Sequence, residues 1–308
     1  MIAVGVDVGK GFLDVAVHGE VAVRRFSNSK AGIGSLVKQL LKRGEVHVVV
    51  EATGGYEAGV LEACARAGIW IAQVNPRQAR DFAKATGQLA KTDALDARIL
   101  AEMVSVLMPR LRRHVPAADW ENELKSWLRR RNQVTVQIIS NTQQSAVSLP
   151  PVRAMIKRTL AALKRERDLI DAAMQALVGT HATPALQGKG QGPMFQAAAL
   201  ALLPELGRLS RQQIAKLVGV APLNRDSGQS KGKRKIYGGR AQMRVALYMA
   251  TLSAVRWEPE LRAHYQQLRA RGKVAKVALV ACMRKLLGIV NARRRDELRR
   301  GGSALCTA

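Results

Sequence analysis

The sequence lacks the features of membrane-spanning, exported and disulfide-stabilised proteins. Its best apolar run, residues 197–203, ends at Pro204, well short of the ~20 residues that span a bilayer. No charged segment leading into an apolar stretch opens the chain. The three cysteines, Cys64, Cys282 and Cys306, have neither CxxC nor Cys/His spacing, which argues against a zinc site. We therefore expect a soluble protein that is not exported and works in a reducing cytoplasm.

Acidic and aromatic residues are also scarce. The chain has 50 Lys/Arg against 23 Asp/Glu, a net charge of +27, and only 4% aromatic residues. Residues 1–100 hold 13 Lys/Arg and 10 Asp/Glu, so residues 101–308 hold 37 and 13. Charge of this size favours polyanions, and few aromatics favour contacts to phosphates over base stacking. Nucleic acid is the expected partner, although a merely soluble basic surface or a ribosomal-type binder would have the same composition.

The first 110 residues alternate between short β-branched runs and helical patterns. Gly9-Lys10-Gly11 separates the first two runs as a hairpin turn. The patterns predict strands at 2–8, 12–18 and 21–26, a helix at 31–43, a strand at 46–50, a helix at 56–67, a strand at 69–74, and helices at 76–85 and 93–106. Three antiparallel strands followed by alternating helix and strand predict an α/β RNase H/RuvC-like domain over 1–110.

Residues 117–180 have the apolar spacing of a coiled coil, with steps of four and three residues. Pro150-Pro151 interrupts the pattern, so we expect two long helices that fold back as a hairpin or pair with a second copy. Arg131 and Arg167 occupy core-spaced positions, which weakens the simplest dimer. An ordinary helical bundle that fills its own core explains the spacing equally well.

Residues 186–295 predict a mainly α-helical domain. Helices are expected at 194–203, 211–218, 240–255, 258–271 and 273–291, with a polar loop at 221–239. The arginine-rich residues 293–300 predict a solvated end or one that touches nucleic acid, and residues 296–308 a disordered tail.

Four acids suggest a metal centre. Asp7 and Glu51 each end an apolar strand, where a carboxylate requires a cation or a hydrogen-bonded cap. Asp93 and Asp96 lie three residues apart at the start of a predicted helix, on one face. Convergent carboxylate oxygens are the ligands that Mg²⁺ prefers, and two such ions stabilise the attacking and leaving oxygens of a phosphodiester displacement.

Each acid also has a simpler explanation. Asp93 fits the acid preference of a helix's first turn, and Asp7 fits a cap for the turn at Gly9. Asp14 lies in the middle of the neighbouring strand, and Asp81 and Glu57 are expected on exposed helix faces. We leave these last three residues out of the site.

Three segments carry a resemblance to a known family. GVDVGK (5–10), VEATGGYE (50–57) and KTDALDARILA (91–101) resemble the Asp-Glu-Asp-Asp pattern of the RuvC-like domain of insertion sequence 110 transposases. LVGVAPLNRDSGQSKGKRKIYGGRAQMRVALYMA (217–250) is similar to the second, serine-bearing domain of that family, the transposase 20 domain. The resemblance implies a DNA transposase or recombinase.

Ser227 is the candidate nucleophile in the polar loop. Lysine and arginine side chains around it suit phosphate binding, and Gly228 lets backbone N–H groups approach closely. Ser227 matches the Ser-Gly step of the family motif and is preferred over Ser230 and Tyr237. No histidine lies near it in the sequence, so its activation would come from the metal cluster or the carboxylates of the first domain.

The resemblance implies partners as well as chemistry. It implies donor and target DNA, an element-encoded bridge RNA as guide, assembly into a dimer or tetramer, and Mg²⁺, with Mn²⁺ as a substitute, in a nucleoid-associated prokaryotic protein. The expected nucleic-acid contacts are Lys91, Arg98, Arg225, Lys231, Lys233, Arg234, Lys235 and Arg240.

Two other functions fit parts of the sequence. A metal-dependent endonuclease like a Holliday-junction resolvase needs the four acids but not Ser227. A catalytically inactive nucleic-acid-binding protein needs only the fold and the charge.

Overall fold

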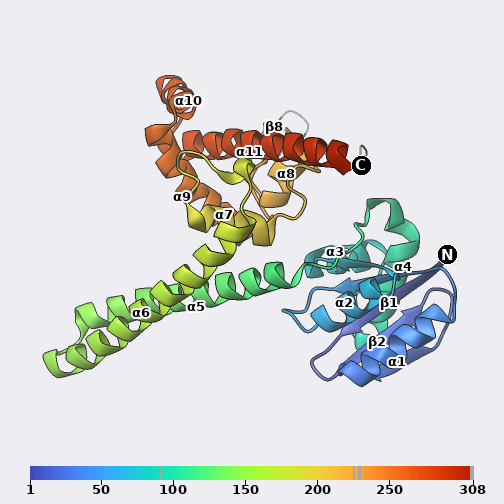
Figure 1. Cartoon of the computed structure of the whole chain (residues 1–308). Coiled ribbons are helices and arrows are strands. Elements are labelled where there is room, and N and C mark those ends of the chain that lie inside the picture. Colours follow the sequence, from blue (N-terminus) through green and yellow to red (C-terminus); the bar gives the residue numbers. More distant parts are fainter. Residues whose placement is uncertain (91, 225, 228–229, 233, 306–308) are drawn as a thin grey trace. The chain divides into compact units, whose positions relative to one another are not determined.

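The computed structural model describes residues 1–90, 92–224, 226–227, 230–232 and 234–305, with side chains omitted at 226–227, 230–231 and 301–305. The chain divides into two compact units, Met1–Ala117 and Ala118–Ala308 (Figure 1). The first unit contains β1 (Ile2–Val8), β2 (Phe12–Val17), β3 (Val23–Ser27), α1 (Lys30–Leu41), β4 (Val46–Glu51), α2 (Ala58–Arg66), β5 (Trp70–Val74), α3 (Pro76–Ala85), α4 (Asp93–Leu107) and a short 3-10 turn (Met108–Arg110).

The strands of the first unit form one five-stranded sheet in the order β3-β2-β1-β4-β5. β1, β2 and β3 pair antiparallel, whereas β4 pairs parallel with β1 and β5 parallel with β4. This order and these directions are those of the RNase H/RuvC-like fold. The predicted α/β fold class is therefore confirmed.

The two faces of the sheet are covered by different helices. Because successive strand residues alternate between faces, Val4, Val6 and Val8 pack with the buried side chains of α1 and α2. Ala3 points the other way and packs with α3 and α4, as does Val49 of β4. The odd-numbered residues of β1, including Gly5 and Asp7, thus face α4.

Helix α4 approaches β1 unusually closely. Ala97 and Ala101 of α4 and Ala16 of β2 form a small, fully buried cluster. A Cβ added to Gly5 would overlap the Ala97 carbonyl oxygen and the Ala101 amide nitrogen, and would lie 2.7 Å from Leu100 Cβ. Only residues with little or no side chain allow this contact, which sets the distance between the sheet and the start of α4.

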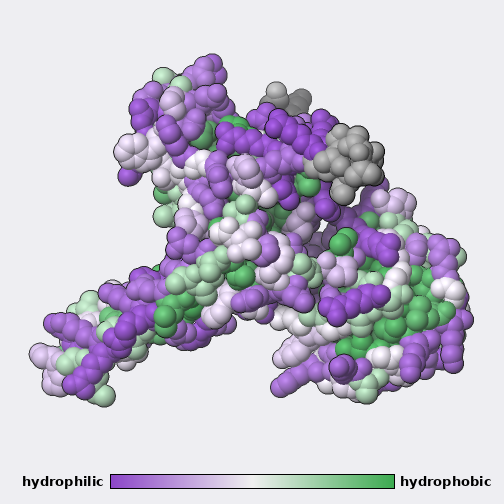
Figure 2. Space-filling view, in the orientation of Figure 1, coloured by the Kyte–Doolittle hydropathy of each residue, from purple (hydrophilic) through white to green (hydrophobic). Residues whose placement is uncertain are grey.

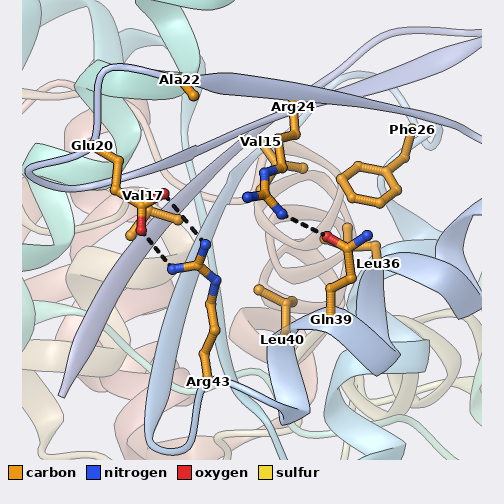
Figure 3. Close-up of a pocket in the computed structure, with 10 residues that line it drawn as sticks. All are labelled: Val15, Val17, Glu20, Ala22, Arg24, Phe26, Leu36, Gln39, Leu40 and Arg43. Atoms are coloured by element: carbon orange, nitrogen blue, oxygen red, sulfur yellow. Dashed lines mark hydrogen bonds and ion pairs between the residues drawn. The ribbon is translucent and has the colours of Figure 1, made fainter.

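A small hollow lies on the opposite side of the sheet, between α1 and the β2–β3 ribbon (Figure 3). Arg43 donates to Glu20 at 2.6 Å, and Arg24 donates to Gln39 at 3.3 Å across its rim. Its volume of about 20 Å³ is that of one water site, so it offers no room for a substrate.

The second unit is mainly helical. It contains α5 (Asp119–Val147), α6 (Pro150–His181), a 3-10 turn (Pro184–Leu186), α7 (Pro193–Leu202), α8 (Arg211–Val218), β6 (Pro222–Leu223), β7 (Asp226–Ser227), β8 (Ser230–Lys231), β9 (Lys235–Ile236), α9 (Ala241–Trp257), α10 (Pro259–Ala270) and α11 (Ala275–Leu305). The expected α/β unit followed by a helical unit is confirmed, and the loop predicted at 221–239 contains four two-residue strands. No helix in the described part of the chain is long and apolar enough to cross a membrane.

Helices α5 and α6 fold back on each other as a hairpin (Figure 1). Leu124 and Val134 of α5 pack with Ile170 and Met174 of α6, and this seam continues onto α7. Arg131, at a core-spaced position, forms an ion pair with Asp171 at 2.5 Å. Of the two arrangements expected for the helices, this chain contains the hairpin.

Helix α11 extends well beyond the predicted end near residue 291, since it runs to Leu305. Its arginine-rich stretch is therefore helical rather than an irregular end. Glu297 explains part of this order, because its carboxylate accepts from Arg294 Nη1 at 3.0 Å and contacts the Ala185 amide. The last three residues, 306–308, lie outside the described part.

The contact between α4 and β1 gives a test. We expect Gly5→Ala to destabilise the protein by about 3 kcal/mol, because its methyl group forces α4 away from the sheet. Urea unfolding measures the loss. Gly34→Ala on α1 is the control, since nothing lies within 4 Å of its added methyl group, and it should gain about 0.5–1 kcal/mol. Equal effects of the two substitutions would contradict the close packing.

Candidate active site

Two of the predicted acids leave the sheet side by side. β1 and β4 are parallel, with Val6 opposite Val50, so the next residues, Asp7 and Glu51, end neighbouring strands at one edge. Both side chains are half-buried. Their positions in the alternating strand pattern direct them to the α4 face of the sheet.

The other two acids come from the first turn of α4. Thr92 is the N-cap of this helix, and its hydroxyl accepts from the Leu95 amide at 3.3 Å. Asp93 is therefore the first helical residue rather than the cap, and it lies in the first turn, where acids are favoured. Asp96 lies three residues after Asp93 on the same side of the helix, next to Ala97, where α4 meets the sheet at Gly5.

The four acids interact electrostatically. Burial and the neighbouring carboxylates of Asp96, Asp93 and Glu51 raise the pKa of Asp7 to about 6. Each of the other three predicted acids thus lies close enough to oppose ionisation of Asp7. The structure thus places Glu51, Asp93 and Asp96 within electrostatic range of Asp7.

Asp14 also belongs to this edge, although the sequence analysis left it out. It pairs with Asp7 across the antiparallel β1–β2 ladder, and residues directly opposite share a face. Carboxylate oxygens of Asp7, Asp14 and Asp93 all lie within 4.8 Å of one another. Asp14 is buried and accepts two hydrogen bonds of 2.8 Å from Arg25 on β3. Arg25 therefore balances the charge of Asp14.

Glu57 was predicted on an exposed helix face, and this prediction is wrong. Its side chain is buried because it turns back into the loop that follows Glu51. It accepts from Thr53 N, Thr53 Oγ1 and Gly55 N at 2.8–3.2 Å, and from Gln73 Nε2 at 2.8 Å. Although burial opposes ionisation, these hydrogen bonds hold the pKa of Glu57 below its usual value. Asp81 is exposed, as expected.

The site suits a divalent cation. Its donors are all carboxylate oxygens, the ligands of hard ions such as Mg²⁺. Burial and the neighbouring carboxylates raise the pKa of Asp7, and a bound cation would offset the repulsion between the carboxylates. Asp7, Asp14 and Asp93 have carboxylate oxygens close enough to share such an ion, and Glu51 and Asp96 lie within electrostatic range of Asp7.

Ser227 lies in the second unit, in a hairpin of two-residue strands. It ends β7, opposite Ser230 of β8. β6 and β9 pair at the base of the same loop, with Pro222 opposite Ile236. The side chains of the two serines lie outside the described part of the chain, so the structure establishes the backbone setting of Ser227 alone.

Glycines join the two ends of the loop that carries Ser227, residues 221–239, here called the serine loop. A Cβ on Gly219 would overlap Gly238 O, and one on Gly239 would overlap the backbone at Gly219. All three glycines have positive φ, between 69° and 79°. Arg240 N also donates to Leu217 O at 3.0 Å. Direct backbone contact therefore joins the two ends of the loop.

The basic residues expected to touch nucleic acid fall into three groups. Arg234 and Lys235 are exposed on the serine loop. Arg98 donates to Val21 O at 2.6 Å, and Arg240 pairs with Glu205 at 2.6 Å, so both have partners within the fold. Lys91, Arg225, Lys233 and the Lys231 side chain lie outside the described residues.

Two family models match this chain. The first, an Asp-Glu-Asp-Asp model of the IS110 type described as a transposase, matches residues 4–150. The second is described as a transposase of the IS116/IS110/IS902 family and matches residues 185–266. The four acids lie within the first match, and Ser227 lies within the second.

Known proteins are also similar to this chain in sequence. The pilin gene-inverting protein of Moraxella lacunata is 26% identical over 312 residues, covering 93% of each chain. The insertion element IS110 uncharacterized 43.6 kDa protein of Streptomyces coelicolor is 27% identical over 142 residues, covering 45% of this chain and 35% of its own. A solved structure, T. thermophilus RuvC in complex with Holliday junction substrate, is 17% identical, with 37% of this chain and 99% of that chain covered and a TM-score of 0.29.

The carboxylate cluster makes a prediction about stability and pH. In EDTA at pH 7.5, Asp7→Asn should stabilise the fold by about 1 kcal/mol, a value reduced for partial solvent exposure. In the folded protein the pKa of Asp7 is about 6, against an ordinary value of 3.8. Above pH ~6 the ionised carboxylate of Asp7 therefore destabilises the folded state to its full extent. Below pH ~4 it is protonated in both states, and the gain should vanish.

Urea unfolding between pH 4 and 8 measures this gain. Asp81→Asn, at an exposed acid paired with Arg77, is the control and should give no gain at any pH. A loss of stability on Asp7→Asn at pH 7.5 would show that the carboxylates do not repel one another.

Proposed function

The chain belongs to the IS110 family of transposases, and from that premise we propose that it cuts and rejoins DNA strands at the ends of a mobile element and at its target. The observation that supports the proposal is that β1 and β4 end side by side and that the carboxylates of Asp96, Asp93 and Glu51 lie close enough to raise the pKa of Asp7. Phosphoryl transfer requires charge neutralisation at the reacting phosphate, which this edge can support with a cation.

Mg²⁺ is the proposed metal, held by the four acids, with Mn²⁺ as a substitute. When bound, it would neutralise charge on the phosphate and on the attacking and leaving oxygens. The chain's own contribution is to fix these carboxylates on two adjacent strands and one helix turn, before any substrate arrives.

Ser227 is the proposed nucleophile. Its Oγ would bond to the scissile phosphorus while the bond to one strand end breaks, and that strand end leaves as a hydroxyl with a proton. The hydroxyl of a new strand then displaces the serine, which recovers its proton. A phosphoserine ester keeps the energy of the broken phosphodiester, so rejoining needs no ATP. The exposed Arg234 and Lys235 on the same loop support a phosphate-binding role.

The proposal extends to the remaining parts of the chain. The resemblance to the family supports a bridge RNA as guide and a dimer or tetramer as the active assembly. Residues 1–110 would hold the metal, residues 186–295 would carry the serine, and residues 117–180 would form an arm. A basic, aromatic-poor chain suits duplex backbones, which leaves sequence reading to base pairing.

The serine role predicts a covalent adduct. Purified with its copurifying nucleic acid and given Mg²⁺ and labelled donor and target DNA, the wild-type protein should form a protease-sensitive protein–DNA species on a denaturing gel. Ser227→Ala should form none while still binding DNA, and Ser230→Ala is the matched control that should retain it. Adducts in Ser227→Ala would exclude this nucleophile, and equal cleavage in both proteins without adducts would indicate a resolvase-like nuclease.

The metal-binding role predicts that removal of one of the four carboxylates lowers strand cleavage. Glu51→Gln should lower metal-dependent strand cleavage by about a hundredfold or more, since it removes one of the four carboxylates. Glu62→Gln is the control, because Glu62 pairs with Arg66 on the surface of α2 at 2.7 Å. Initial rates with Mg²⁺ and with Mn²⁺ give the measurement, and undiminished cleavage by Glu51→Gln would refute the assignment.

A further inference from the structure

The far half of the helical hairpin, residues 132–165, carries cations without acids. This tip segment contains five Lys/Arg residues and no Asp or Glu. The near half differs, because three of its arginines have acidic partners. The ion pairs there join Arg130 to Glu166, Arg131 to Asp171 and Arg167 to Asp168. Positive charge at the tip is therefore not balanced within the segment.

A groove runs between the two helices of the tip segment, with a volume of about 590 Å³. Lys157 and Lys164 line it from α6, and the hydroxyl residues Thr142 and Ser145 line it from α5. Both lysines are exposed, and they lie seven residues apart, or about 10 Å along the helix. We call this feature the tip groove. Figure 2 shows hydrophilic side chains beside apolar ones at this end of the hairpin.

We propose that the tip groove binds the phosphate backbone of duplex DNA. The ammonium groups of Lys157 and Lys164 and the hydroxyl of Ser145 can donate hydrogen bonds to phosphate, whereas the Thr142 hydroxyl donates to Ile138 O at 2.7 Å. None of the residues in 132–165 is aromatic, so the segment has no platform for unstacked bases. The inference deepens the proposed function and rests on it in one respect, that the enzyme's substrate is DNA. It assigns to the arm a grip on the duplex outside the reacting phosphate.

The rival occupant is a second copy of this chain. Val147, Leu149, Val152 and Met155 are each more than half exposed near the turn of the hairpin, as residues in a protein contact would be. The charge of the tip groove argues against a second copy of the chain as its occupant. Two tip segments in contact would bring together ten cations and no acid of their own, whereas a phosphate backbone supplies the opposite charge.

A pair of double variants isolates the groove from bulk charge. Lys157→Ala with Lys164→Ala removes two cations that line it, and Arg158→Ala with Arg165→Ala removes two exposed cations from the adjacent positions outside it. Both full-length proteins lose the same charge from the same helix. Arg153 is kept, because it donates to Ser148 O at 2.8 Å at the end of α5.

Binding of a fluorescent 30-base-pair DNA duplex, followed by anisotropy in EDTA across a salt series, gives the readout. The groove variant should bind about tenfold more weakly near 0.15 M NaCl, and its log Kd against log salt slope should fall by about 2. The outer variant should stay within about twofold of wild type. Light scattering should show the same mass for all three proteins.

Several results would overturn the inference. Equal weakening by both variants would mean that only bulk charge matters. A changed mass with unchanged affinity would assign the groove to a second copy, and weakening confined to a 30-base-pair RNA duplex would exclude DNA as its ligand. Since no cleavage occurs in EDTA, these results are independent of the serine adduct. A protein that forms no adduct can still show the binding difference.

Discussion

The close contact between α4 and β1 is the constraint on which the rest of the first unit depends. Gly5 has no side chain, and Ala97 and Ala101 present almost none, so the helix backbone rests directly on the strand. Any larger residue would lift the first turn of α4 and separate Asp93 and Asp96 from Asp7. Packing of the smallest residues thus determines where the most highly charged groups lie.

This arrangement places like charges together, and the surrounding structure compensates for only part of them. Arg25 balances Asp14 through two hydrogen bonds and lies 4.0 Å above the Phe12 ring, so its position is fixed from two sides. The burial and neighbours of Asp7 raise its pKa instead. Arg25 also lies 3.9 Å from the Asp93 carboxylate, so one arginine lies between two acids of this edge, while Asp7 has a raised pKa.

The sequence predicted elements whose ends have local signals. Helix α3 begins where expected because Asn75 caps it and Pro76 occupies its first turn. The sequence analysis selected Asp7, Glu51, Asp93 and Asp96 because each marks a strand end or a helix start. It could not place Asp14, whose role follows from strand register, or Glu57, whose burial depends on a loop turning back toward Gln73. The end of α11 was predicted too early because the arginine run has no apolar periodicity, although it also contains no helix-stopping residue.

The glycine contacts at the base of the serine loop have a consequence for how such a protein can change over time. Gly219, Gly238 and Gly239 bring the two ends of the loop together through main-chain atoms. Residues around Ser227 can therefore change without altering the main-chain contacts that hold the two ends of the loop at α8 and α9.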